Sequence, residues 1–246
     1  MTYCVAIKLN AGLVCLADTR TNAGIDNISK FKKLFTWKEP GERAITMMTS
    51  GNLAITQAVM SLLQENIDDP KYSAETLLTA PSMFRVAEIV GEAMRKIQTR
   101  YGPGLSARGE NSTSSILVSG QRKGGKPRLF MIYSAGNFIE ATSDTPFLQI
   151  GEHKYGKPIL DRVIVPETSL GDALTAALLS MDSTLKSNLS VGMPLDLTVQ
   201  SEGKFDFDEE RRIEPDDAAF EALSDAWSAG LIDAFKIMRN SMSISN

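Results

Sequence analysis

The sequence contains few of the residues that hold metal ions in proteins. Among its 246 residues are one histidine, His153, and two cysteines, Cys4 and Cys15. This shortage excludes a zinc site built on two or three imidazoles, and it excludes a cysteine-rich metal cluster. Both cysteines lie in apolar, strand-like stretches, which predicts buried and reduced thiols rather than a disulfide framework. We expect neither a metal nor another cofactor.

Basic residues and long apolar runs are also scarce. The chain has 26 lysines and arginines against 30 aspartates and glutamates, a formal net charge of -4, so a nucleic-acid-binding surface is not expected. No apolar run reaches the length of a membrane span, and the N-terminus lacks the basic-then-apolar pattern of a signal peptide. These absences predict a cytoplasmic protein that binds neither nucleic acid nor membrane.

The single histidine limits the catalytic groups available to a hydrolase. A Ser-His-Asp or Cys-His triad would have to use His153. That residue lies in "QIGEHKYGKP", a glycine-flanked turn, where we expect an exposed loop histidine. The base of a hydrolase built on this chain is therefore expected to be an amine rather than an imidazole.

Hydrophobic residues recur with period two in some stretches and with helical period in others. Ser169 and Asp172 are spaced like a capping box at the start of one helix. Loops are expected at 20–29 and 101–112. Strands are predicted at 2–9, 13–19, 33–39, 43–51, 113–121, 128–137, 138–151, 193–200 and 204–213, and helical faces at 55–63, 83–97, 169–187 and 216–238.

The order of these elements predicts the fold class. Blocks of strands alternate with blocks of helices, which suits antiparallel sheets covered by helices. We expect an α+β protein with a four-layer αββα sandwich, and no linker marks a second domain within 1–246. The C-terminal helix at about 216–239 has a stripe of Phe, Trp and Leu. That stripe either covers the core or serves contacts between subunits.

One stretch resembles a phosphate-binding loop but departs from it at a decisive position. "GQRKGGKP" at 120–127 has the required spacing up to Lys126 and then places Pro127 where a magnesium-binding Ser or Thr is needed. It also leads into a strand, so no helix N-terminus is available to bind phosphate. A basic hairpin turn is expected here. Any ATP-driven unfolding of substrates would then need a separate protein.

The N-terminus offers the amine that such a hydrolase needs. Thr2 follows Met1 directly and begins a strand. Once Met1 is removed, Thr2 carries both a hydroxyl nucleophile and an α-amine with a pKa of about 8. Such an amine is partly neutral near physiological pH and can accept the hydroxyl proton. Methionine before a residue as small as threonine is a favourable substrate for removal.

Several ordered motifs carry a family resemblance. "TYCVAIK", "LADTR", "FKKLF" and "TSGNLAITQA" together resemble a proteasome-type β subunit of the N-terminal-nucleophile hydrolase superfamily, and most closely the bacterial Anbu family. The resemblance covers nearly the whole chain and implies the αββα sandwich. It also implies a threonine-type peptidase that cleaves peptide or protein substrates through an acyl-enzyme on Thr2. Identical subunits would assemble into a ring or a helical turn.

The resemblance also implies residue roles. Thr2 would be the nucleophile, and Lys33 would lie beside its hydroxyl. Asp18 would hold that lysine, because a buried lysine without a partner readily loses its charge. The backbone N–H of Gly51 would form the oxyanion hole, and Asp182 would lie near the threonine amine.

The resemblance leaves the supporting serine open between two residues. The serine that supports Thr2 would be Ser190 or Ser187, while Glu152 follows Gly151 where the family has a serine. The resemblance places substrate contacts at three residues, Asn22, Thr49 and Leu53. Two alternatives share this fold: a weak or inactive scaffold or binding subunit, and a non-peptide amidase or transamidase.

Overall fold

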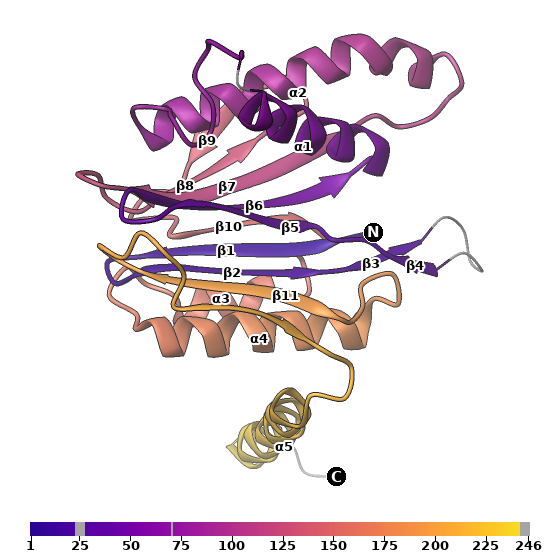
Figure 1. Ribbon diagram of the computed structural model, residues 1–246. Helices are drawn as coiled ribbons and strands as arrows, with labels where there is room; N and C mark the ends of the chain where they lie inside the picture. Colours follow the sequence, from indigo (N-terminus) through magenta and orange to yellow (C-terminus); the bar gives the residue numbers. More distant parts are fainter. Residues whose placement is uncertain (23–27, 70, 242–246) are drawn as a thin grey trace.

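Two five-stranded antiparallel sheets stack face to face in the computed structural model, which describes residues 1–22, 28–69 and 71–241. Helices α1 and α2 lie outside one sheet, and α3 and α4 lie outside the other, as Figure 1 shows. The predicted αββα sandwich is therefore confirmed.

In the first sheet the strands β1, β2 and β11 are buried on both faces, whereas the edge strand β12 is mostly exposed. The strand order of this sheet is β10-β1-β2-β11-β12. One face carries large apolar residues toward α4, whereas the other carries Cys4, Ala6, Cys15 and Ala17 toward the second sheet. Small side chains on that inner face allow the sheets to pack closely. The strands are β1 (Tyr3–Leu9), β2 (Gly12–Asp18), β10 (Phe147–Gly151), β11 (Leu195–Ser201) and β12 (Glu209–Ile213).

The second sheet has the strand order β5-β6-β7-β8-β9. Apolar residues of its outer face pack against α1 and α2 in the largest hydrophobic cluster. Asn52 and Ser82 cap these two helices by accepting from the N–H groups three residues on. Its elements are β5 (Leu34–Glu39), β6 (Arg43–Gly51), β7 (Ser114–Arg122), β8 (Arg128–Ile132), β9 (Phe138–Glu140), α1 (Leu53–Asp68) and α2 (Met83–Ser106).

Helices α3 (Lys157–Val163) and α4 (Leu170–Ser187) cover the first sheet. The N-cap half of the predicted capping box is present at α4, where the Asp172 N–H donates to Ser169 Oγ at 3.1 Å, while the Asp172 carboxylate accepts from that hydroxyl at 2.7 Å in place of the backbone N–H of Ser169. Both cysteines are free and buried, as predicted. His153 is exposed, as predicted.

Several predicted elements differ from the structure. The strands predicted at 128–137 and 204–213 are shorter, as β8 and β12. The stretch 138–151 forms two short strands in different sheets, because the polar segment 141–146 crosses between the sheets. Helix α2 continues to Ser106 through the expected loop, and the carbonyl of Pro103, in its last turn, still accepts from the Ala107 N–H at 3.0 Å. In the expected loop 20–29, β3 (Arg20–Asn22) pairs with β4 (Ile28–Lys30), while 23–27 lie outside the described residues.

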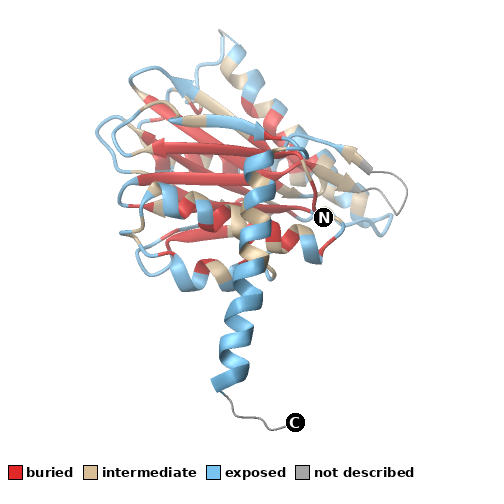
Figure 2. Ribbon diagram, turned by 90° about the horizontal axis from the view of Figure 1, so that it is seen from below, coloured by how far each residue is buried: buried red, intermediate tan, exposed pale blue. Residues whose placement is uncertain are grey.

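Helix α5 (Ala218–Ser241) divides into two halves. In the first half Phe220 packs on the cluster beneath the first sheet. Figure 2 shows the second half projecting beyond the body of the molecule. There Leu231, Phe235 and Met238 are 50, 64 and 56% exposed. The apolar stripe therefore covers the core only in its first half. None of the helices in the described ranges is both long and apolar enough to span a bilayer.

Candidate active site

Thr2 is held by a backbone hydrogen bond of its own carbonyl and by a bond from the N–H of the next residue to a side chain. The Glu152 N–H donates to the Thr2 carbonyl at 2.7 Å, and the N–H of Tyr3 donates to Asp18 Oδ1 at 3.0 Å. Gly151 has φ +83°, and a Cβ there would lie 1.9 Å from the Thr2 oxygen. Only glycine allows this approach. Thr2 is therefore fixed at the start of β1, between β2 and β10.

Lys33 and Asp18 form a buried ion pair beside Thr2. Lys33 Nζ donates to Asp18 Oδ1 at 2.7 Å and to the Arg20 carbonyl at 2.6 Å. The two side chains are only 4 and 0% exposed. An ammonium has three donors, and the third is directed at the Met1 carbonyl, 3.5 Å away. Removal of Met1 would free that donor for Thr2.

Asp18 is in turn held from three directions. Besides Lys33 and Tyr3, the N–H of Gly192 donates to Asp18 Oδ2 at 3.2 Å. Burial raises the pKa of the Asp18 carboxyl, and the Lys33 ammonium and the two N–H groups act against that rise. The charge on Asp18 thus depends on Lys33.

Thr2 and Lys33 open onto a cleft of about 570 Å³ between the two sheets. Five residues expected from the sequence line this cleft, namely Thr2, Lys33, Thr49, Gly51 and Leu53. Asp18 is bound to Lys33 behind the cleft wall. The cleft is lined by Met1, Thr2, Thr21, Lys33, Thr49, Ser50, Gly51, Leu53, Thr56, Gly151 and Glu152.

The backbone of β6 forms the wall opposite Thr2. The Thr49 N–H donates to the Lys33 carbonyl at 3.0 Å, which fixes the lysine against this strand. Gly51 has φ +97°, and a Cβ there would lie 2.2 Å from the Thr113 carbonyl oxygen. The end of β6 can therefore take this path only with glycine, and its backbone is open to the cleft.

Three other expected residues, Asp182, Ser187 and Ser190, are not among the residues that line the cleft. Asp182 is buried on the face of α4 that is turned to α5, with Oδ2 3.9 Å from the Nζ of Lys186, which in turn donates to Ser228. Ser190 lies in the turn after α4, where its N–H donates to Asn188, and Ser187 is exposed at the end of α4. Asn22 belongs to β3, and its side chain lies outside the described part of the structure.

The structure adds residues that the motifs did not reveal. Thr21, Ser50 and Thr56 line the cleft, but isolated threonines and serines carry no pattern that distinguishes them. Gly192 could have been found from its residue type, because a glycine two positions after Ser190 permits a close approach of another segment. A Cβ on it would lie 2.1 Å from Arg20 Nε.

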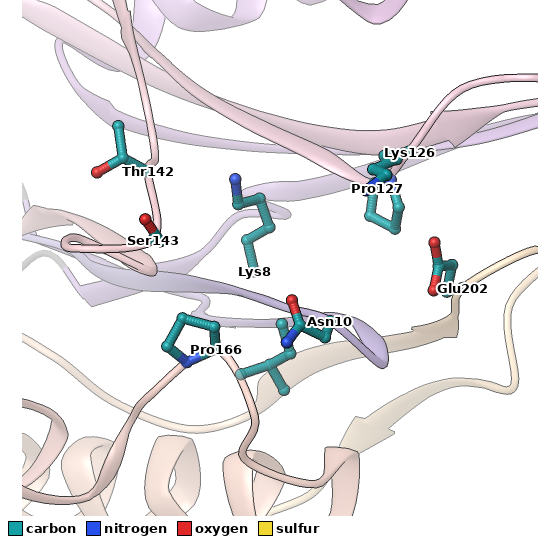
Figure 3. Close-up of a pocket in the computed structure, with 9 residues that line it drawn as sticks. Lys8, Asn10, Lys126, Pro127, Thr142, Ser143, Pro166 and Glu202 are labelled. Carbon is teal, nitrogen blue, oxygen red and sulfur yellow. The ribbon is translucent and has the colours of Figure 1, made fainter.

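A second hollow lies at the other end of β1 (Figure 3). It measures about 290 Å³ and is surrounded by turns of both sheets. The Lys8 amine donates to the Ala141 carbonyl at 2.8 Å, and Lys126 and Glu202 lie on its rim. Within the described residues, no group of three or more His, Cys, Asp or Glu side chains is placed to hold a metal ion at either end.

The stacked antiparallel sheets, the flanking helices and a threonine opening an inner strand beside a buried Lys–Asp pair define the fold of the N-terminal-nucleophile hydrolases. The sequence model of the proteasome subunit family matches residues 2–199. No curated protein matches the chain. Solved structures match it over nearly its full length, among them the following three.

Anbu from Hyphomicrobium sp. strain MC1 is 51% identical over 100% of this chain and 99% of its own, with a TM-score of 0.87. Anbu (ancestral beta-subunit) from Yersinia bercovieri is 46% identical over 96% of each chain, with a TM-score of 0.89. The helical assembly of the Anbu complex from Pseudomonas aeruginosa gives 49% identity over 96% of each chain and a TM-score of 0.90. The chain therefore belongs to the proteasome subunit family, in its Anbu branch.

Proposed function

We propose that this chain, after removal of Met1, is a threonine-type peptidase that cleaves peptide bonds through an acyl-enzyme on Thr2. The observation that carries the proposal is the position of Thr2. It is held at the start of β1 on a cleft, with the Lys33 ammonium 3.5 Å from the Met1 carbonyl and therefore beside the bond whose cleavage frees the Thr2 amine.

The proposed reaction needs only groups at this site. The free Thr2 amine takes the proton from its own hydroxyl, directly or through one water, and Oγ1 attacks the substrate carbonyl. The Lys33 cation favours the negative charge that develops on the attacking oxygen. The Gly51 N–H donates to the oxygen of the tetrahedral intermediate. The amine then gives its proton to the leaving amine, and water hydrolyses the acyl-enzyme by the reverse use of the same groups.

Substrate contacts are proposed at the wall of the cleft that is formed by β6 and α1. Thr49 and Leu53 flank Gly51 there, so a side chain of the substrate would enter between them. A cleft of about 570 Å³ is large enough for a peptide side chain and its neighbouring backbone. Asn22 is proposed to bind the substrate strand.

We also propose that identical subunits assemble, as the helical Anbu complex from Pseudomonas aeruginosa does. The exposed half of α5 supports this, because large apolar side chains at helical spacing stand in water there. Replacing Leu231 and Phe235 by glutamate should reduce the assembled mass measured by light scattering. Unchanged assembly would show that other surfaces hold the subunits together.

The decisive experiment is intact mass spectrometry before and after treatment with a peptide epoxyketone or β-lactone. We expect loss of Met1 and then one reagent mass added to Thr2, and we expect a Thr2→Ala variant to fold without being labelled. A protein that starts at Thr2 but stays unlabelled would favour a scaffold subunit. Labelling without cleavage of any peptide in a library would favour an amidase of non-peptide substrates.

A further inference from the structure

Glu152 is placed at Thr2 by the backbone. Its N–H donates to the Thr2 carbonyl at 2.7 Å, and the glycine before it lies directly against Thr2. Among the described residues that line the cleft, Glu152 is the only one with a carboxylate. The strand pairing therefore fixes this acidic residue beside the N-terminus.

The charged groups around the N-terminal amine come from three parts of the fold. Lys33 precedes β5, Asp18 ends β2 and Glu152 follows β10. The first two are bound to each other at 2.7 Å, whereas the ion-pair partner of Glu152, Lys154, is 3.9 Å away with a side chain that is 68% exposed. An exposed pair at that distance is weak, so the charge of Glu152 remains available to the amine.

Arg20 is the other cation close to the site, and it faces away from the amine. Its guanidinium donates to the Leu189 carbonyl at 2.9 Å and packs on Gly192. The described groups that act on the amine are then Lys33, Asp18 and Glu152. Burial and Lys33 lower the pKa of the Met1 amine, while Asp18 and Glu152 act in the opposite direction. The same groups surround the Thr2 amine, one peptide unit further along.

From this placement we infer that Glu152 is a positioning residue for the Thr2 amine: its carboxylate holds the ammonium that forms when the amine takes the hydroxyl proton. This inference rests on the proposed function. It assigns a role to the acidic residue that stands where the proteasome-type resemblance would place a serine. The carboxylate acts through the amine and takes no proton itself.

Such a role has a signature that loss of structure cannot imitate. A carboxylate beside an ammonium makes the amine a stronger base, but it also keeps the amine protonated to a higher pH. Replacing Glu152 by glutamine should therefore shift the acid limb of the pH–rate profile down by about one pH unit. With a Brønsted coefficient of about 0.5, Glu152→Gln should be labelled about threefold faster than wild type at pH values below the acid limb. At pH values above the limb it should be labelled about threefold slower. A structural defect would slow labelling at every pH.

The experiment measures the labelling rate of the Met1-free protein by intact mass between about pH 5.5 and 9 for wild type and Glu152→Gln. The matched control is Glu202→Gln, which removes the same charge from the opposite end of β1, and its profile should coincide with that of wild type. Glu152→Asp should restore part of the shift. An acid limb at the same pH in wild type and Glu152→Gln would overturn the inference.

A second measurement separates this inference from the proposed peptidase activity. The pKa of the Thr2 amine can be titrated by NMR in protein carrying isotope-labelled threonine, without any turnover. A lower pKa in Glu152→Gln supports the inference even where no reagent labels Thr2, which would reject the peptidase alone. An unchanged pKa rejects the role of Glu152 even where Thr2 is labelled normally.

Discussion

The two ends of strand β1 differ in one respect that decides their chemistry. Each end opens into a hollow between the sheets, and each hollow contains a lysine. At the Thr2 end Lys33 is buried and paired with Asp18. At the other end Lys8 is partly buried and donates to a main-chain carbonyl, with the exposed Glu202 on the rim. In the proposed function it is the lysine fixed by burial and by a carboxylate, Lys33, that serves the reaction.

The sharpest test of this comparison removes each lysine in turn. Lys33→Ala leaves Asp18 as an unpaired buried carboxylate, so unfolding free energy should fall by about 3–5 kcal/mol, and Thr2 labelling by a factor on the order of 10²–10³. Lys8→Ala loses one hydrogen bond, which costs about 1 kcal/mol, and should label like wild type. Denaturant titration and intact mass measure both effects. Equal losses of stability and of labelling in the two variants would show that the two lysines do not differ in role.

The next test removes the carboxylate partner. Asp18→Asn keeps the size of the side chain but leaves the Lys33 ammonium buried without a counterion. Stability should fall by about 3 kcal/mol, and labelling should fall on the order of a hundredfold, because the lysine then tends to lose its charge. Glu202→Gln, with its exposed side chain, should change stability by less than about 0.5 kcal/mol. A stable Asp18→Asn variant would show that Lys33 needs no counterion.

Glycines at the two ends allow a backbone comparison. Gly51→Ala meets both a positive φ and the Thr113 carbonyl at 2.2 Å, so it should cost about 3 kcal/mol and move the proposed oxyanion donor. Gly203, at the other end, also has positive φ, but a Cβ there would meet no atom within 4 Å. Gly203→Ala should then cost about 1 kcal/mol from strain alone. Thermal unfolding separates the two values.

The smallest predicted effect concerns pH. Burial raises the pKa of Tyr3, beside Thr2, to about 12 from 10.0, and its hydroxyl bonds with Ser180 and Gln149. The folded protein therefore retains this proton longer than the unfolded chain does. That stabilisation is complete below pH 10 and is lost between about pH 10 and 12, at about 1.4 kcal/mol per pH unit. In Tyr3→Phe the unfolding free energy should lack this part of its fall between about pH 10 and 12. An identical slope of unfolding free energy against pH in wild type and variant would contradict the assignment.

The sequence predicted most of this architecture because apolar period and turn residues are local signals. The hairpin of β1 and β2 and the cap of α4 needed only neighbouring residues. The separation of β9 from β10 could not be predicted, since short strands give the same pattern whether they share a sheet or not. Helix α3 has seven residues, too few for helical period to be distinguished.

The site also combines residues that local motifs predicted with residues that only the packing of distant segments places. Thr2, Asp18 and Lys33 were expected from ordered motifs, and the structure brings them together. Asp182 is not among the residues that line the cleft; its carboxylate lies 3.9 Å from Lys186, which donates to Ser228 of the docked helix α5. Such docking depends on contacts between distant segments, which one sequence does not display. Glu152 was visible as an unexpected residue after Gly151, but only the pairing of β10 with β1 places it beside the N-terminus.

The Gly192–Asp18 hydrogen bond spans 174 positions of the chain, and this separation has a consequence for synthesis. A ribosome makes Thr2, Asp18 and Lys33 within the first 33 residues, long before β10 and the turn at Gly192 emerge. Until those later segments dock, Thr2 lacks its support from β10, and Asp18 lacks the N–H of Gly192. Under the proposed function, a nascent chain thus carries Thr2 through most of its translation before the groups that position it are in place.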